Sequence, residues 1–93
     1  MRTIERSTKF KRDYKRELKD RHGAALDADL APVIAALASD APLDPKHQDH
    51  ALSGAWAGYR DCHVKPDLIL IYAKPGDETL RLARLGSHSE VFG

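Results

Sequence analysis

Apolar residues recur every four positions near the start of the chain and predict an amphipathic helix. The stripe consists of Phe10, Tyr14 and Leu18. Ser7 or Thr8 is suited to cap its N-terminus, because a hydroxyl oxygen can accept a hydrogen bond from a backbone N–H of the first turn. Gly23 is expected to end the helix. Before it, residues 2–6 alternate between polar and apolar side chains, which indicates a short strand.

A second helical pattern follows at once. Its apolar residues are Leu26, Leu30, Val33, Ile34 and Leu37. Pro32 falls within the pattern, and proline cannot donate the backbone hydrogen bond that a helix interior needs. The helix therefore starts near Asp29, with proline in its first turn, or it is kinked; the late start is favoured. Two adjacent amphipathic helices predict an antiparallel hairpin that packs on a sheet.

The second half of the chain carries strand patterns. The predicted strands are residues 56–64, 68–74 and 79–85. Pro75-Gly76-Asp77 is a turn between the last two, and residues 41–49 have the composition of a loop. Residues 68–72 are apolar on both faces, so we expect a central strand covered by the helices. The expected fold class is α+β, with a small antiparallel sheet packed against two N-terminal helices in a single domain, residues 1–93.

Composition indicates a soluble globular protein, and the charge is unevenly distributed. Of the 93 residues, 42% are hydrophobic and 31% are charged, and the formal net charge is +1. Residues 1–21 hold nine Lys and Arg against four Asp and Glu, whereas residues 22–49 hold one against five. The basic first helix is interpreted as a face that docks on RNA phosphates. The alternatives are a solvated amphipathic helix and a surface that binds an acidic partner protein. The proposed docking residues are Lys9, Arg12, Lys15, Arg16 and Lys19.

Several classes of protein fit poorly. The single cysteine, Cys62, cannot form an internal disulfide, and no apolar run is long enough to span a membrane, so we expect a cytoplasmic protein without a membrane partner. Ser87 and Ser89 do not lie in a nucleophile-elbow motif. No metal and no cofactor are expected, because the residues that could be imagined as ligands follow no usual spacing. Those residues are His47, Asp49, His50 and His63.

Groups that exchange protons near neutral pH are concentrated in and around the predicted strands. They include His50, His63 and His88, three of the five histidines in the chain. Cleavage of RNA without a metal needs a base for the ribose 2′-hydroxyl, an acid for the departing 5′-oxygen and a positive charge for the phosphate. Imidazole suits both proton transfers, because its ordinary pKa is about 6.5. The pattern therefore favours phosphodiester cleavage, with RNA as the substrate.

Each residue also has a purely structural interpretation. His50 follows a loop and could be an ordinary surface residue. His63 and Asp67 flank a turn at Pro66, where a local hydrogen bond could hold the turn. Two ion pairs are further alternatives: Arg84 with Asp61, and Arg60 with Asp67.

An ordered run of residues carries a family resemblance. From Asp49 to Tyr72 the chain reads Asp-His-x-Leu-x-Gly-x-Trp-x-Gly-Tyr-Arg-Asp-x-His-Val-x-Pro-Asp-x-Ile-Leu-Ile-Tyr, followed by Arg84-x-Gly-x-His88 and a terminal Phe-Gly. This run resembles the YafQ branch of the RelE/ParE toxin superfamily, and the resemblance spans essentially the whole chain. It implies the ribosome-dependent endoribonuclease toxin of a type II toxin–antitoxin system. Leu68 departs from the pattern, since related toxins often carry tryptophan there.

The resemblance also implies roles for residues. His50, His63, Asp67 and His88 match the positions that the family uses for catalysis. We expect His88 to be the general acid, and Asp67 or His63 to be the base or to orient it, with the division among His50, His63 and Asp67 left open. Arg84 would supply the positive charge for the phosphate, and Phe92 would lie near the substrate.

Partners follow from the same resemblance. They are the ribosome, mRNA and a cognate antitoxin, a small DNA-binding dimer with an acidic segment. The toxin alone is expected to be a monomer and to form a hetero-oligomer with the antitoxin. Two other functions stay open: a ParE-like inhibitor of a topoisomerase that performs no nuclease chemistry, and a catalytically inactive module that binds an antitoxin or RNA.

Overall fold

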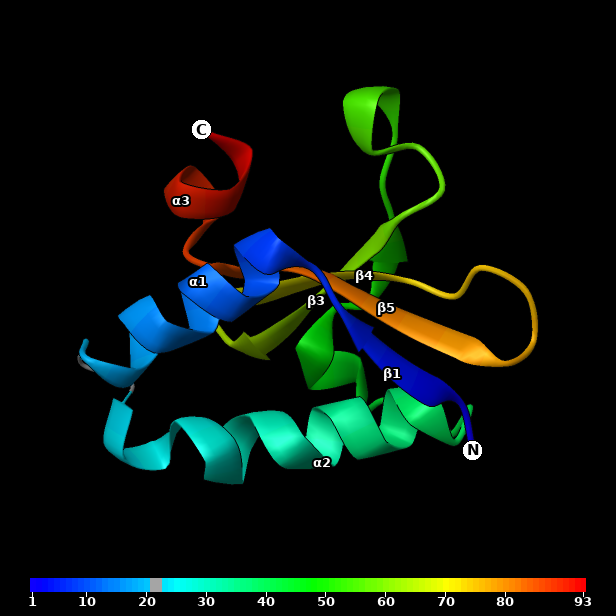
Figure 1. The fold of residues 1–93 in the computed structure, drawn as a ribbon, viewed down its shortest axis with the longest axis horizontal. Helices are drawn as coiled ribbons and strands as arrows, with labels where there is room; N and C mark the ends of the chain where they lie inside the picture. Colours follow the sequence, from blue (N-terminus) through cyan, green and yellow to red (C-terminus); the bar gives the residue numbers. More distant parts are fainter. Residues whose placement is uncertain (21–22) are drawn as a thin grey trace.

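Five strands form one sheet that carries helices on both of its sides (Figure 1). This computed structural model describes residues 1–20 and 23–93. The strands are β1 (Thr3–Arg6), β2 (His50–Ala51), β3 (Arg60–Lys65), β4 (Leu68–Ala73) and β5 (Thr79–Gly86), in the order β1-β5-β4-β3-β2. The neighbours from β5 to β2 are antiparallel, and β1 pairs in parallel with β5 at the edge. The expected α+β fold is confirmed, with β1 as an added parallel edge strand.

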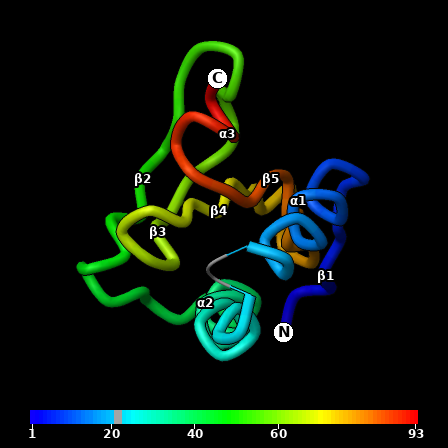
Figure 2. The backbone as a smooth tube through the Cα atoms, turned by 90° about the vertical axis from the view of Figure 1, so that its left-hand side faces the viewer, coloured from blue at the N-terminus to red at the C-terminus, as the bar shows by residue number. Residues whose placement is uncertain are grey.

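The sheet separates two apolar layers. β4 is the central strand, and all six of its residues are buried, as predicted. On the side of α1 (Thr8–Leu18) and α2 (Leu26–Ala38), which we call the helical face, its residues are Leu68, Leu70 and Tyr72. On the other side, which we call the cleft face, Ile69 and Ile71 pack with the short helix α3 (His88–Phe92) and with Trp56 and Tyr59. Figure 2 shows α2 below the sheet, with α3 and the loop after β2 above it.

The first helix begins where the sequence predicts and ends earlier. Ser7 is the N-cap: its hydroxyl accepts a hydrogen bond from the backbone N–H of Phe10 at 2.9 Å and donates to the carbonyl of Ala83 at 2.7 Å. The helix ends at Leu18, so the prediction that Gly23 ends it is wrong. A Cβ atom on Gly23 would lie 2.0 Å from the carbonyl oxygen of Leu18. Glycine is needed there because the chain folds back against the helix end.

The second helix starts earlier than expected. α2 begins at Leu26, so the predicted start near Asp29 is wrong and Pro32 lies inside the helix. Leu26 is completely buried, and burying a leucine side chain stabilises a fold by about 2 kcal/mol. Pro32 leaves the carbonyl of Ala28 without its helical donor, but both residues are exposed, so water can take the donor's place. Among the described helices, none is long and apolar enough to cross a bilayer.

Residues 52–59 form a loop, although part of this segment is predicted as strand. β3 starts at Arg60, and Gly54–Trp56 forms a short 3-10 turn instead. Gly58 has a φ of +90°, which ends the turn, and the rings of Trp56 and Tyr59 pack edge to face with centroids 5.2 Å apart. The sequence patterns also missed β2, α3 and the 3-10 turn Pro45–His47. These elements are too short to show a hydrophobic period.

The placement of Cys62 gives a direct test of the fold. Its thiol is completely buried on the helical face, and burial raises its pKa to about 12. Because thiolate is the reactive form, we predict that a thiol reagent at pH 8 labels the native protein at least about a hundredfold more slowly than the unfolded protein. Labelling at the unfolded rate would contradict the register of β3 on β4.

Candidate active site

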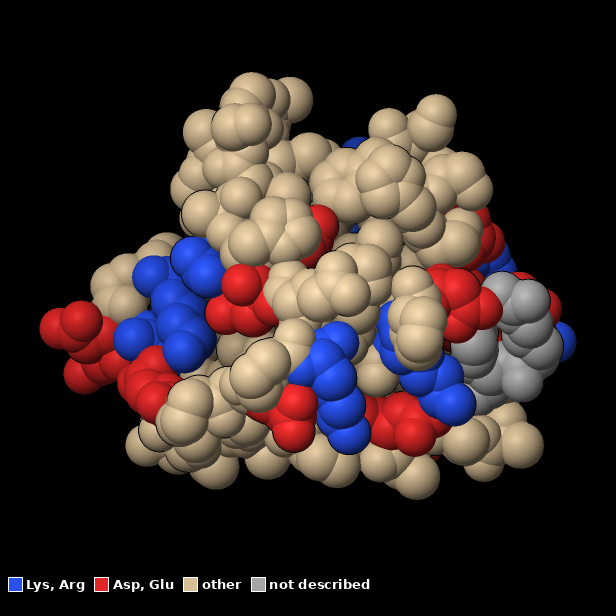
Figure 3. All heavy atoms as spheres, turned by 180° about the vertical axis from the view of Figure 1, so that it is seen from behind, with Lys and Arg blue, Asp and Glu red and all other residues tan. Residues whose placement is uncertain are grey.

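Three histidines from three elements come to the cleft face. His50 on β2 lies directly opposite Asp61 on β3, and His63 follows Asp61 by two residues, so both β3 side chains point to the same face. His88 is in the first turn of α3, which stands on this face beside the loop of residues 52–59 (Figure 1). In the space-filling view these two segments form separate lobes with a notch between them (Figure 3). The structure thus gathers the three histidines on the cleft face, near Asp61.

Asp61 is a carboxylate at this site that the sequence analysis did not identify as a functional residue. Its side chain is only 4% exposed, and its Oδ1 lies 3.1 Å from Nδ1 of His50. Burial raises the pKa of Asp61, while the nearby imidazoles of His50, His63 and His88 lower it; the net shift is upward. The sequence does indicate this placement, because Asp61 lies two residues before His63 in a predicted strand and residues two apart lie on the same face.

The hydrogen bonds of two histidines determine which ring nitrogen carries the proton. Nδ1 of His50 lies 2.7 Å from the carbonyl oxygen of Gln48, and Nδ1 of His63 lies 3.2 Å from that of Pro66. A carbonyl only accepts, so Nδ1 carries the hydrogen in both rings and Nε2 of the neutral ring is an acceptor. His47 donates from its own Nδ1 to the carbonyl of His63 at 2.6 Å and braces that residue. Both site imidazoles can therefore take up a proton at Nε2.

The turn between β3 and β4 holds Asp67. Asp67 is exposed beside Pro66, and an extra residue in β3 shifts the register between His63 and Lys65. Bulges of this kind are common next to active sites, where they redirect side chains. The bond between His63 and the Pro66 carbonyl shows that the structural interpretation of this turn is right for His63. It leaves Nε2 of His63 available for chemistry.

The C-terminal motif is built around a short capped helix. Ser87 caps α3: its hydroxyl accepts from the N–H of Glu90 at 3.2 Å, and its own N–H donates to the Glu90 carboxylate at 2.8 Å. The rings of His88 and Phe92 lie one turn apart with centroids 4.9 Å from each other, and Phe92 is half-buried. A Cβ atom on Gly86 would lie 2.7 Å from the Arg16 guanidinium and 3.1 Å from the Glu90 side chain, so a larger residue here would displace the contacts between Arg16 and α3.

Arg84 is held by a residue of the first helix. Its Nε donates to Asp13 at 2.7 Å, and its Nη2 donates to Asp13 and to the carbonyl of Glu90, both at 3.3 Å. The alternative pairing with Asp61 is therefore wrong. The other alternative, Arg60 with Asp67, is also wrong, because Arg60 pairs with Asp49 at 3.3 Å.

Asp13 is the centre of a buried network. Its side chain is 5% exposed, and besides Arg84 it accepts hydrogen bonds from Arg16 at 2.9 Å and from the N–H of Leu85 at 3.0 Å. Burial by itself raises the pKa of Asp13, but the bonds from Arg84 and Leu85 and the charges of both arginines outweigh it, so the pKa is lowered. Asp13 is therefore a fixed anion between α1 and β5.

The proposed docking residues do not form one continuous surface. Lys9, Arg12, Lys15 and Lys19 are exposed, but Arg16 is engaged by Asp13, Glu17 and Glu90. A hollow of about 320 Å³ contains Lys9, Arg12 and Arg16 together with Arg84, whereas Lys15 lines a groove on another side of α1. The basic side chains of α1 therefore lie on two different sides of the helix.

The described residues do not fit a metal ion. Among residues 1–20 and 23–93, no group of three or more His, Cys, Asp or Glu side chains is placed to hold one. The imagined ligand set of His47, Asp49, His50 and His63 is therefore not such a group.

The comparisons with known proteins agree over the full length. Residues 2–93 match the family described as bacterial toxin of type II toxin–antitoxin system, YafQ. The mRNA interferase toxin YafQ of Escherichia coli K12 is 37% identical over 92 residues, 97% of this chain and 99% of that protein. A copper-bound mutant toxin from Helicobacter pylori matches with a TM-score of 0.90 and 42% identity, covering 99% of this chain and 100% of that one. YafQ in the E. coli DinJ–YafQ complex matches with a TM-score of 0.86 and 38% identity, covering 100% of both.

The fold and these matches define a toxin of a type II toxin–antitoxin system. Within that class, the chain belongs to the YafQ family.

The close approach at Gly86 gives a test of the network. In Gly86→Ala the added Cβ meets Arg16 at 2.7 Å and the Glu90 side chain at 3.1 Å, so one of them must move. We predict a loss of stability of about 1 to 3 kcal/mol, the range for overpacked sites, measured by denaturant unfolding. Unchanged stability, with α3 in place, would show that Arg16 does not lie over Gly86.

Proposed function

We propose that this chain is a ribosome-dependent endoribonuclease that cleaves translated mRNA in the cytoplasm, and that residues 1–93 act as one domain. The E. coli relative bears the name mRNA interferase toxin. The observation that carries the proposal is the convergence of His50, His63 and His88 on one buried carboxylate, Asp61. A site of this kind can supply both an acid and a base near neutral pH.

The chemistry follows from the groups present. The ribose 2′-oxygen attacks phosphorus and passes its proton to the base, the bond from phosphorus to the 5′-oxygen breaks, and the acid protonates that oxygen. We assign the acid to His88 and draw the base from His50, His63 and Asp67. The tautomers favour the two imidazoles, because each offers Nε2 as an acceptor. The products are a 2′,3′-cyclic phosphate and a 5′-hydroxyl.

Two residues are assigned to the substrate. Arg84 would neutralise the developing charge on the phosphate. Asp13 and Glu90 occupy its Nε and Nη2, so Nη1 is the nitrogen that we assign to the phosphate. Phe92, half-buried beside His88, offers a ring on which an unpaired base can stack.

Two variants test this assignment. We predict that His88→Ala and His63→Ala each slow cleavage of ribosome-bound mRNA at least about tenfold, since a general acid or base contributes about 100- to 10,000-fold. Ser89→Ala, an exposed neighbour of His88, is the matched control and should cleave at the parental rate. If His88→Ala folds and cleaves normally, the acid is misassigned. If the parental chain is toxic but cleaves no mRNA, a topoisomerase inhibitor is the better account; if it is neither toxic nor cleaves mRNA, an inactive binding module is.

We propose that the exposed basic residues of α1 dock on ribosomal RNA. They are Lys9, Arg12, Lys15 and Lys19. Arg16, the fifth residue of the predicted set, is engaged by Asp13, Glu17 and Glu90 and is left out of the docking face. Phosphate contacts release counterions, so affinity should fall steeply with salt.

The charge requirement is measurable. We predict that Lys9→Glu combined with Arg12→Glu weakens ribosome association and flattens its dependence on salt, because each lost phosphate contact lowers the slope by about 0.7 to 0.9. Titrations at several salt concentrations give the slope. Lys46→Glu, an exposed change on the 3-10 turn before β2, serves as the control. A slope equal to the parental one would return α1 to the role of a solvated face.

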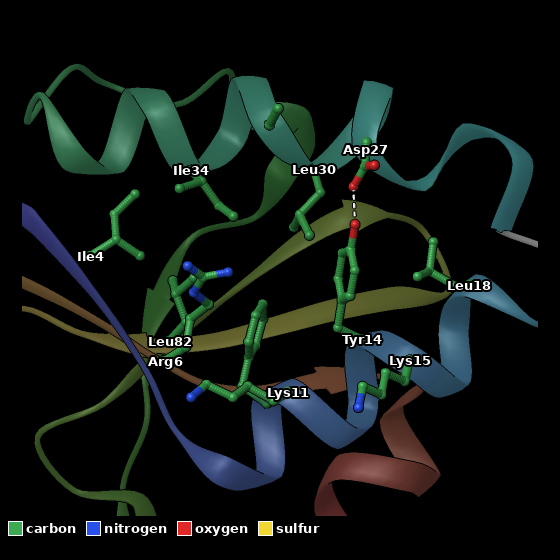
Figure 4. A pocket seen from close by; sticks show the side chains of 12 residues that line it. Ile4, Arg6, Lys11, Tyr14, Lys15, Leu18, Asp27, Leu30, Ile34 and Leu82 are labelled. Atoms are coloured by element: carbon green, nitrogen blue, oxygen red, sulfur yellow. Dashed lines mark hydrogen bonds between the residues drawn. The ribbon is translucent and has the colours of Figure 1, made fainter.

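A groove between α1 and α2 suits an acidic partner segment. It measures about 600 Å³, and Figure 4 shows Leu30, Ile34 and Leu82 in its lining, with Lys11 and Lys15 at its edge. Ile4 and Leu18 also line it and are each 43% exposed, which is unusual for large apolar side chains grouped at one place. We propose that the acidic segment of the cognate antitoxin folds on this groove and covers α1, the helix that carries the proposed docking residues.

The site of antitoxin binding can be located by hydrogen exchange. We predict that the complex with the product of the neighbouring gene protects the amides of α1 and α2 relative to the toxin alone. Leu18→Glu should weaken co-purification, because it puts an acidic group into an apolar groove that is expected to meet acidic residues. Protection confined to β3, β4 and β5, with α1 unchanged, would contradict this electrostatic account.

A further inference from the structure

The helix that carries His88 and Phe92 has little stability of its own. α3 spans five residues, and isolated helices shorter than about 12 residues are marginal in water. One apolar side chain, Val91, is buried beneath it. Its position must therefore come from contacts with the rest of the molecule.

Two arginines provide polar contacts to α3. Arg16 of α1 lies 3.1 Å from the Glu90 carboxylate and donates to the carbonyl of Leu85 at 2.8 Å, just before α3 begins. Arg84 of β5 donates to the carbonyl of Glu90 at 3.3 Å. Both guanidinium groups therefore bind the segment from Leu85 to Glu90, which leads into α3 and forms its first turn.

A single anion orients both arginines. Asp13 accepts from Arg84 through Nε and Nη2 and from Arg16 through Nη1, and it also accepts the backbone N–H of Leu85. Because its side chain is 5% exposed, water competes weakly for these bonds. The two guanidinium groups would repel each other without the carboxylate between them.

We propose that Asp13 is a positioning residue for the nuclease site: acting through Arg84 and Arg16, it fixes α3 so that His88 and Phe92 face the cleft. This role rests on the function proposed above. Asp13 itself touches no substrate. In this account α1, which carries the proposed docking residues, and α3, which carries His88, form one rigid unit. α1 then contributes to the chemistry as well as to docking.

The expected effect follows from geometry. Asp13→Asn removes the negative charge that Arg84 and Arg16 share and one of the two oxygens to which they donate, so the two partly buried guanidinium groups repel each other and can shift away from α3. α3 then loses its polar contacts to Arg16 and Arg84 but keeps its own cap. A displacement of about 1 Å in a reacting group can cost about a hundredfold in rate.

The direct test compares Asp13→Asn with the parental chain. We expect kcat for ribosome-bound mRNA to fall between about tenfold and a hundredfold, with little change in KM, because Asp13 faces the interior. Hydrogen exchange should show faster exchange at the amides of Val91 and Gly93, which are bonded within α3, while the amides of β4 stay protected. Glu5→Gln is the matched control, since it removes another carboxylate that pairs with a β5 arginine, Arg81.

A double-mutant cycle separates positioning from general damage. Because Asp13 acts partly through Arg84, Asp13→Asn combined with Arg84→Gln should be slower than Arg84→Gln alone by clearly less than the full loss that Asp13→Asn causes in the parental chain; the remaining loss is the part that runs through Arg16. Multiplied losses would overturn the proposal. If Asp13→Asn does not fold, Glu90→Gln takes its place: glutamine retains the capping box but loses the ion pair with Arg16, and kcat should fall in the same direction.

Two outcomes remain distinct. Parental kcat together with parental exchange of α3 in Asp13→Asn would overturn the positioning role while leaving the nuclease intact. A parental chain that does not cleave mRNA would instead refute the proposed function. In that case, faster exchange of α3 in Asp13→Asn would still support the structural link, and unchanged exchange would refute it too.

Discussion

The burial of β4 on both faces is the constraint from which the rest of the structure follows. A strand without a solvent face requires cover on each side, and the chain supplies two different covers. The helical face receives the larger core beneath α1 and α2, whereas the cleft face receives a smaller cluster under α3 and residues 52–59. Because the second cover is made of two small segments, it leaves a notch between them. The three histidines lie on this cleft face, near Asp61.

The cover on the cleft face buries few apolar side chains, so α3 also depends on contacts with α1. α3 is a single turn and a half that carries two residues of the proposed site. Its apolar contribution is small, so charged contacts to α1 and β5 make up the difference. A buried carboxylate between two arginines is a costly arrangement unless every group is satisfied, and here each oxygen of Asp13 accepts at least two hydrogen bonds. The same helix presents lysines to solvent, so the Asp13 network joins the proposed docking face to the proposed site.

The sequence was informative wherever a pattern has a period or a fixed spacing. The stripe of Phe10 and Tyr14 and the apolar run of β4 placed the main elements, and the ordered run around His50 and His63 pointed to the region that the structure gathers on the cleft face. Two helix boundaries were predicted wrongly. Gly23 lies against the Leu18 carbonyl instead of ending the helix there, and α2 starts before Pro32 because Leu26 is buried and the exposed Ala28 carbonyl can bind water.

Asp13 could not be recognised from the sequence, because its contact with Arg84 joins residues 71 positions apart. From the sequence alone, an acidic residue such as Asp13 on an otherwise basic helix is expected at the surface. Only the fold shows that β5 lies against it. α3 was missed because it is too short to show a period, although Ser87 and Glu90 carry the spacing of a capping box. Asp61 was missed as a site residue because alternation along a strand becomes informative only when one knows which face is the cleft.

The central claim is that imidazole groups of the cleft face cleave RNA by attack of the ribose 2′-hydroxyl. The most direct measurement is the chemistry of the ends produced when the purified protein acts on mRNA in a programmed ribosome. The account predicts a 2′,3′-cyclic phosphate, or the phosphate that forms when it opens, on the upstream fragment and a 5′-hydroxyl on the downstream one. Fragments with a 5′-phosphate and an upstream 3′-hydroxyl, or cleavage that stops when divalent ions are removed and the ribosome stays intact, would contradict it.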